Sequence, residues 1–167
     1  TIVHLERRGE YTLSTLLSLI NRGIAGDLAV ERFATACIFT YEPEGREFVF
    51  ANGGHHPALL FRAEAGRFEE LDTPGIPVGI EASTVYRETF AQLAPEDIVI
   101  LYTDGILEAE NETGDRFREH RLRETILSLR GEGAEAIVEG IVGAVEQFVG
   151  AAPQHDDQTL IVLKATE

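Results

Sequence analysis

The spacing of apolar residues predicts helices near both ends of the chain. Between Thr12 and Ile24, leucines and isoleucines recur every three or four residues, which places them on one face of an amphipathic helix. Upstream of it, Ile2, Val3 and Leu5 are interpreted as the end of an earlier helix. Two more apolar stripes in the second half predict helices around Leu122, Ile126 and Leu129, and around Ile137, Ile141, Ala144, Val145 and Phe148.

The middle of the chain has the pattern of short strands joined by local turns. Runs rich in β-branched and aromatic residues are separated by Gly, Pro and acidic turn residues. Because parallel strands need crossovers of a dozen or more residues, these short connections predict antiparallel pairing. The run Ile98–Tyr102 is apolar at every position, which is typical of a central strand covered on both faces. The expected strands are Phe33–Tyr41, Glu47–Ala51, Ala58–Phe61, Arg67–Leu71, Val85–Phe90, Ile98–Tyr102 and Thr159–Leu163.

Strands in the middle with helices toward both ends predict an α+β layered fold. The 167 residues match the length of one ordinary domain with one hydrophobic core, so residues 1–167 are interpreted as a single domain. Hydrophobic residues make up 44% of the chain and charged residues 26%, which excludes a disordered or fibrous protein. No apolar run approaches the roughly 20 residues of a membrane helix, so no membrane insertion is expected in this segment.

The charge and cysteine content narrow the class of partners and the compartment. Acidic residues outnumber basic ones by 29 to 14, which gives a net charge of −15. Such a surface repels a phosphate backbone, so nucleic acid is not an expected partner, whereas a divalent cation or a basic partner is compatible. The single cysteine, Cys37, is interpreted as a buried thiol, and it favours a reducing, cytoplasmic compartment. Because the chain begins at Thr1 and contains no Met, we expect further residues upstream.

Two acidic motifs adjoin the most strand-like runs of the second half. Asp104-Gly105 follows Ile98–Tyr102 after one residue, and Asp156-Asp157 comes just before the final strand. If the two strands are neighbours, these carboxylates converge at one sheet edge, where they repel one another unless a proton or a cation lies between them. Oxygen ligands of this kind select hard ions such as Mg²⁺, Mn²⁺ or Ca²⁺. Each motif alone is more often a solvated turn, so the metal site is favoured only by the two together.

Other polar residues are weaker candidates. Glu108 and Glu110 could line the same edge, with a solvated acidic loop as the alternative, which is the preferred interpretation for Glu110 and Glu112. His155 is a candidate for a supporting or proton-transfer role. The glycines of Gly53-Gly54 predict a turn or bulge with positive φ, and His55-His56 behind them are interpreted as structural, because no cysteine or helix-spaced partner supports a zinc site.

Five short motifs follow one another along the chain. They are Glu31-Arg32-Phe33-Ala34-Thr35, Phe50-Ala51-Asn52-Gly53-Gly54-His55-His56-Pro57, Gly75-Ile76-Pro77-Val78-Gly79, Leu101-Tyr102-Thr103-Asp104-Gly105 with Glu108-Ala109, and Asp156-Asp157-Gln158-Thr159. In this order they resemble the bacterial PPM (PP2C-like) serine/threonine phosphatases, in the branch typified by SpoIIE and RsbU. Five motifs in register are far more specific than any one of them, and they cover nearly the whole chain.

The resemblance implies a sandwich of two antiparallel sheets flanked by helices and the hydrolysis of phosphoserine or phosphothreonine in a partner protein. It implies two Mn²⁺ or Mg²⁺ ions, which activate a water and neutralise the phosphoryl oxygens. Asp104 and Asp156 match metal-ligating aspartates of the family and are the expected catalytic residues. Gly105 and Asp157, their neighbours in the motifs, complete the expected metal site. The implied partner is a phosphorylated anti-anti-sigma protein of the STAS type, in sigma-factor regulation, and a homodimer is compatible with the same resemblance.

The sequence departs from the family pattern at three places, one of them the Gly53-Gly54 pair where Ala-Gly is common, and the loss of the first motif leaves a second hypothesis open. The family's first metal motif, D-x-x-G-H-G, carries an Asp that bridges both ions, and it is absent from this sequence, where it would precede the segment Thr1–Arg8. Arg118 stands where the family has Gly. The sequence therefore predicts either a phosphatase whose domain is N-terminally incomplete in this chain, or a non-catalytic regulatory module on the same fold. A calcium-binding structural domain is disfavoured, because no EF-hand spacing occurs.

Overall fold

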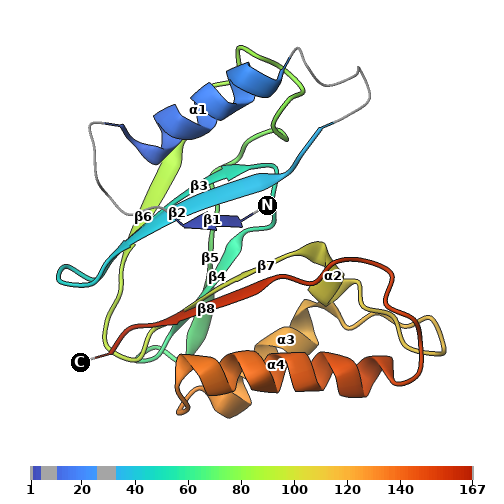
Figure 1. Cartoon of the computed structure of the whole chain (residues 1–167). Coiled ribbons are helices and arrows are strands. Elements are labelled where there is room, and N and C mark those ends of the chain that lie inside the picture. Colours follow the sequence, from blue (N-terminus) through green and yellow to red (C-terminus); the bar gives the residue numbers. More distant parts are fainter. Residues whose placement is uncertain (1, 5–10, 26–32, 167) are drawn as a thin grey trace. The chain divides into compact units, whose positions relative to one another are not determined.

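The computed structural model describes residues 2–4, 11–25 and 33–166, which contain all the elements named below. The elements in chain order are β1 (Ile2–His4), α1 (Leu13–Ile24), β2 (Ala36–Glu42), β3 (Glu47–Gly53), β4 (Ala58–Arg62), β5 (Arg67–Leu71), β6 (Glu88–Gln92), β7 (Ile98–Tyr102), α2 (Asp104–Leu107), α3 (Arg118–Leu129), α4 (Ala134–Val149) and β8 (Leu160–Lys164) (Figure 1). None of the described helices is long and apolar enough to cross a membrane. Leu5, Glu31 and Arg32, which belong to the expected helix end and the first motif, lie outside the described residues.

The strands form two four-stranded sheets. One has the order β1-β2-β3-β6 and the other the order β5-β4-β7-β8. The pairs β2–β3, β3–β6, β4–β7 and β7–β8 are antiparallel, and the first of them is joined by a short turn, as predicted. The pair β1–β2 is parallel. The predicted α+β class, with two mainly antiparallel sheets and accompanying helices, is confirmed.

Two predicted elements differ from those in the structure. The segment Ile2–His4 is a strand paired with β2, so the prediction of a helix end was wrong. Its β-branched residues suit a strand, and three residues are too few to show a helical repeat. The strand predicted at Val85–Phe90 begins only at Glu88. Ahead of it, the Tyr86 N–H donates to the Ser18 hydroxyl of α1 at 3.2 Å, a bond that holds this part of the chain against the helix.

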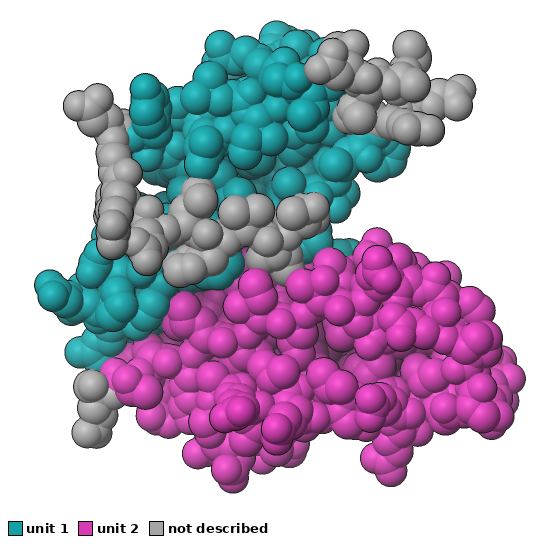
Figure 2. All heavy atoms as spheres, viewed as in Figure 1, with its two compact units in different colours: residues 1–57, 70–93 teal, residues 58–69, 94–167 magenta. Residues whose placement is uncertain are grey.

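The described chain divides into two compact units, coloured separately in Figure 2. Unit 1 comprises residues 1–57 and 70–93, and unit 2 comprises residues 58–69 and 94–167. Unit 1 holds β1, β2, β3, β6 and α1, whereas unit 2 holds β4, β7, β8 and the other three described helices. Each unit has its own cluster of buried apolar side chains, and each is therefore described by itself.

In unit 1, the helix α1 is fixed to its sheet by an apolar and a polar contact. The Thr12 hydroxyl caps the helix, and Leu17 is fully buried in the apolar cluster of this unit. Asn21, also fully buried, donates to the Glu81 carbonyl and accepts from the Gly79 N–H, both at 2.8 Å. A buried amide must satisfy its hydrogen bonds within the protein, so Asn21 fixes the loop between β5 and β6 along the helix.

In unit 2, β7 is the central strand on which the helices pack. All five of its residues are buried, which confirms the expectation from its apolar run. It pairs with β4 on one side and β8 on the other. The cluster of buried side chains joins α3 and α4 to this sheet, through Leu122, Ile126, Ile137, Ile141 and Val145. The arrangement places the end of β7 beside the start of β8, where the two acidic motifs lie.

Candidate functional site

The loop after β7 and the loop before β8 are joined by hydrogen bonds through one threonine. The Thr103 N–H donates to the Thr159 carbonyl at 3.1 Å, and the Thr159 N–H donates to the Thr103 hydroxyl oxygen at 2.9 Å. The same hydroxyl donates to the Asp157 carbonyl at 3.1 Å. The strands beside the two motifs are thus neighbours, which was the condition for the motifs to meet at one sheet edge.

Gly105 lets the backbones of these two loops approach closely. It is buried, and a Cβ at this position would lie 2.9 Å from the carbonyl carbon of Asp157 and closer still to its oxygen. Ordinary contacts of a Cβ atom begin near 3.4 Å, so every other residue type would force the loops apart. The glycine is needed here because of the close approach to Asp157.

The three carboxylates of the motifs lie at this loop pair and are exposed to solvent. The Asp104 carboxylate accepts from the N–H of Gly105 at 3.1 Å. The Asp156 carboxylate accepts in the same way from the N–H of Asp157 at 2.7 Å. Both bonds run to the next residue in the chain, so they orient the carboxylates locally and leave them accessible. The loops thus present Asp104, Asp156 and Asp157 on adjoining segments of unit 2.

The chemistry of these donors suits a hard divalent cation. Mg²⁺ is usually held by one or two carboxylates together with waters and substrate phosphate, and Mn²⁺ also accepts oxygen ligands. Asp104 and Asp156 would provide such a pair. In the part of the chain that the structure describes, no three His, Cys, Asp or Glu side chains gather closely enough to hold a metal ion. The described residues therefore match the expected ions in ligand type, but they do not by themselves form a metal site.

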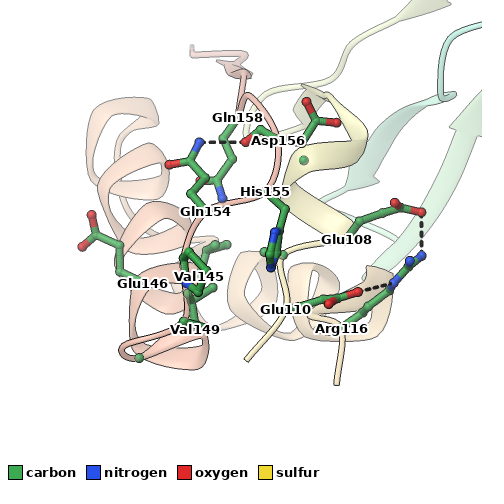
Figure 3. A pocket seen from close by; sticks show the side chains of 15 residues that line it. Glu108, Glu110, Arg116, Val145, Glu146, Val149, Gln154, His155, Asp156 and Gln158 are labelled. Carbon is green, nitrogen blue, oxygen red and sulfur yellow. Dashed lines mark hydrogen bonds and ion pairs between the residues drawn. The ribbon is translucent and has the colours of Figure 1, made fainter. Parts of the chain in front are cut away.

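A pocket of about 480 Å³ opens beside the two loops, wholly within unit 2 (Figure 3). Its walls come from α2 and the hairpin that follows it, from the C-terminal half of α4, and from the segment that precedes β8. In Figure 3 the His155 ring points into the pocket, whereas the carboxylate of its neighbour Asp156 points the opposite way. The lining residues are Gly105, Glu108, Ala109, Glu110, Arg116, Val145, Glu146, Val149, Gly150, Ala152, Pro153, Gln154, His155, Asp156 and Gln158.

Arg116 holds the two glutamates that follow Asp104. Its guanidinium donates to Glu108 at 2.8 Å and to Glu110 at 3.2 Å, across the short hairpin that residues 110 and 116 close. Both glutamates line the pocket and form ion pairs with Arg116, including Glu110, for which a solvated loop was the preferred interpretation. Arg116 was not predicted. The turn residues between the paired positions, Asn111 and Gly114 among them, were the available signal for the hairpin.

The histidine motif Gly53–His56 lies in unit 1 and forms part of a turn. Gly54 has φ of +73°, as predicted for this position. Asn52 is buried and accepts from the His55 N–H at 2.7 Å, while its amide donates to the His55 carbonyl and to Asp72. His55 is therefore placed by the backbone bonds of a turn, which agrees with a structural interpretation. The central role of Asn52 was missed, because its partners are revealed only by the fold.

Comparison with known proteins bears on nearly the whole chain. Residues 1–166 match the family model described as Stage II sporulation protein E (SpoIIE). Phosphoserine phosphatase RsbU of Bacillus subtilis is 26% identical over 151 residues, which cover 90% of this chain and 44% of the relative. The chain thus spans less than half the length of this curated relative.

Solved structures show the same fold. The SiaA-PP2C domain of Pseudomonas aeruginosa has a TM-score of 0.77 at 21% identity, over 90% of this chain and 60% of that one. The manganese-presoaked phosphatase domain of SpoIIE from Bacillus subtilis has a TM-score of 0.65 at 15% identity, over 96% of this chain and 76% of that one. At such identities the likeness concerns the fold, a PP2C-type phosphatase fold, rather than the chemistry.

Proposed function

We propose, from the premise that this chain belongs to the Stage II sporulation protein E (SpoIIE) family, that it carries catalytic residues of a metal-dependent phosphoprotein phosphatase. The observation that carries the proposal is the junction of the two acidic motifs. Thr103 joins their loops by three hydrogen bonds, and Gly105 admits the backbone of Asp157 beside Asp104. This contact keeps the two loops that carry the aspartates side by side.

The expected ions are Mn²⁺ or Mg²⁺, held by the carboxylates of Asp104 and Asp156. Asp157 and the backbone of Gly105 are the further candidate ligands. When bound, the ions would offset the negative charge of the phosphoryl oxygens and would lower the pKa of the attacking water. The residues of the chain orient this site, because Thr103 fixes the separation of the loops and the N–H groups of residues 105 and 157 orient the two carboxylates.

For the substrate, we infer a bacterial signalling protein phosphorylated on serine or threonine. The support is the similarity to a relative that is named a phosphoserine phosphatase. A STAS-type anti-anti-sigma protein, in sigma-factor regulation, is the substrate that this relationship favours. A net charge of −15 also fits an enzyme that needs cations to offset the repulsion of a phosphorylated partner.

The proposal is tested by hydrolysis of p-nitrophenyl phosphate by the protein that carries this chain. We expect turnover with Mn²⁺ that chelation abolishes, and a loss of turnover in Asp104→Asn and in Asp156→Asn. Asp115→Asn is the matched control, because Asp115 is an exposed aspartate that bonds to Thr113 in the neighbouring hairpin and lies outside the loop pair. Full activity in both site variants would overturn the assignment of the residues.

A second candidate is a regulatory module that binds a signalling partner on the same fold without turnover. The observation that favours it is the ligand count, since the described residues do not bring three metal-binding side chains together. The two candidates differ in a single measurement. Tight binding of a phosphorylated partner with no Mn²⁺- or Mg²⁺-dependent release of phosphate would support the module and exclude the enzyme.

A further inference from the structure

Thr103 precedes the first residue of the short helix α2 but does not cap it. A threonine at this place ordinarily uses its hydroxyl oxygen to accept a hydrogen bond from a backbone N–H in the first turn of the helix. The Thr103 hydroxyl makes no such bond. It bonds instead to residues 157 and 159, which lie 54 and 56 positions further along the chain. The side chain therefore serves the contact between the two loops rather than the end of the helix.

The hydroxyl joins the loops at the point where the sheet ends. The last pair of the β7–β8 ladder is Tyr102 with Leu160. Beyond that pair, Thr103 makes three hydrogen bonds to the other loop, and two of them come from its hydroxyl. Because the Thr159 N–H donates to the hydroxyl oxygen and the Asp157 carbonyl can only accept, the hydroxyl proton points to that carbonyl. This proton is therefore not available to a substrate in the same arrangement.

The same hydroxyl is connected to both candidate carboxylates. On one side, Asp104 directly follows Thr103, and its carboxylate accepts from the N–H of Gly105 in the same loop. On the other side, the Asp157 carbonyl accepts from the hydroxyl, while the N–H of that residue donates to the Asp156 carboxylate at 2.7 Å. A change in the bonds of this hydroxyl would therefore shift the two carboxylates relative to each other.

We propose that Thr103 is a positioning residue, whose hydroxyl holds the two aspartate loops at the separation that turnover requires. The inference rests on the proposed phosphatase function, because the separation matters for turnover only if Asp104 and Asp156 act together. It goes further by assigning the dependence to one side-chain oxygen. The backbone of Thr103 supplies only one of the three bonds between the loops, so it does not replace the hydroxyl.

Two variants at position 103 separate the hydroxyl from the rest of the side chain, in the protein that carries this chain. Valine has nearly the shape of threonine but no hydroxyl. With p-nitrophenyl phosphate and Mn²⁺, Thr103→Val should therefore lower kcat about ten- to a hundredfold, because misplaced reacting groups slow the chemical step. KM should change little, because the hydroxyl does not contact the substrate. Thr103→Ser keeps the hydroxyl and should retain most of the activity.

A matched control and a stability measurement distinguish positioning from a merely structural role. Thr125→Val is the control, because the Thr125 hydroxyl donates to the Arg121 carbonyl within α3 at 2.8 Å and lies outside the loop pair. This variant should keep the kcat of the unaltered protein. In urea unfolding, the midpoint of Thr103→Val should fall by no more than about 1 M, because two exposed hydrogen bonds contribute little net stability.

The outcomes separate this inference from the proposed function. An unchanged kcat in Thr103→Val would overturn the inference, and so would a loss in Thr103→Ser as large as the loss in Thr103→Val. A urea midpoint lowered by several molar in Thr103→Val would show a structural role and would overturn it too. Absence of turnover in the unaltered protein would instead overturn the proposed function and this inference with it, so the two failures are distinguishable.

Discussion

The substitution Gly105→Ala isolates the contact between the two acidic loops. The added Cβ would lie 2.9 Å from the Asp157 carbonyl carbon and nearer to its oxygen, against ordinary contacts from about 3.4 Å. Both neighbouring atoms belong to the backbone, so no flexible side chain can move aside. The loops must therefore separate. A displacement of about 1 Å at a reacting group is already enough to impair catalysis.

The size of the effect follows from the bonds that oppose this separation. Three hydrogen bonds from Thr103 join the loops, and each contributes about 0.5–1.5 kcal/mol net. Lengthening them should lower the free energy of unfolding by about 1–3 kcal/mol, which a domain with about 5–15 kcal/mol survives. Activity should suffer more, because a displacement of about 1 Å at a reacting centre costs about a hundredfold in rate.

Two assays on one preparation measure these effects. Urea unfolding gives the loss of stability, and hydrolysis of p-nitrophenyl phosphate with Mn²⁺ gives the loss of kcat/KM. Gly131→Ala is the control, because Gly131 is exposed and a Cβ there would meet no atom within 4 Å. Unchanged stability together with unchanged activity in Gly105→Ala would refute the reasoning that the close approach is needed.

Three further predictions concern the fold. In α4, Gly143→Ala should raise the free energy of unfolding by about 0.5–1 kcal/mol in thermal or urea unfolding, because alanine favours a helix more than glycine and a Cβ there meets no other atom. Gly140→Ala should stabilise the protein less, because its Cβ would meet the Leu129 side chain. Equal gains in the two variants would contradict this reasoning. Asp97 is 1% exposed and accepts hydrogen bonds from an arginine and two backbone N–H groups. The substitution Asp97→Asn should therefore lower the free energy of unfolding, measured in urea, by about 2–4 kcal/mol. A loss below about 1 kcal/mol would exclude a structural role for this carboxylate. Burial raises the pKa of the Cys37 thiol to about 12. A disulfide reagent at pH 8 should therefore label the unfolded chain and spare the folded one. Because the folded state holds this proton more tightly, the free energy of unfolding should be constant below the unfolded pKa of about 8.5 and fall as the pH rises from there toward 12.

The elements that could be predicted from the sequence are those whose signal is local. The continuous apolar run Ile98–Tyr102 coincides with β7, and the stripe of apolar residues at helical spacing lies within α4. The strand Ile2–His4 is too short to carry a period, and its conformation depends on pairing with residues 37–39. Pairing at such a distance leaves no mark within three residues, so a helix and a strand could not be told apart.

The candidate site shows the same division between local and distant information. The aspartates could be named because each stands in a short motif beside a strand, and their neighbourhood followed once the two strands were taken as adjacent. Thr103 and Arg116 could not be assigned. Thr103 acts through residues 54 and 56 positions away, and Arg116 through glutamates across a hairpin whose register the sequence alone does not fix.

Arg118 shows that a departure from a sequence motif need not be a departure in structure. The resemblance places a glycine at this position, so the arginine is a departure from the family pattern. In the structure Arg118 has φ of +61°, in the left-handed region that glycine favours. Because an L-residue there costs about 1–2 kcal/mol, the surrounding contacts must impose this conformation. They include the neighbouring Phe117, which is buried in the core of unit 2, and the Arg121 guanidinium, which donates to the carbonyls of residues 116 and 117. Arg118 thus adopts a conformation that glycine favours, held by the packing around it, so the arginine by itself is no argument against the proposed site.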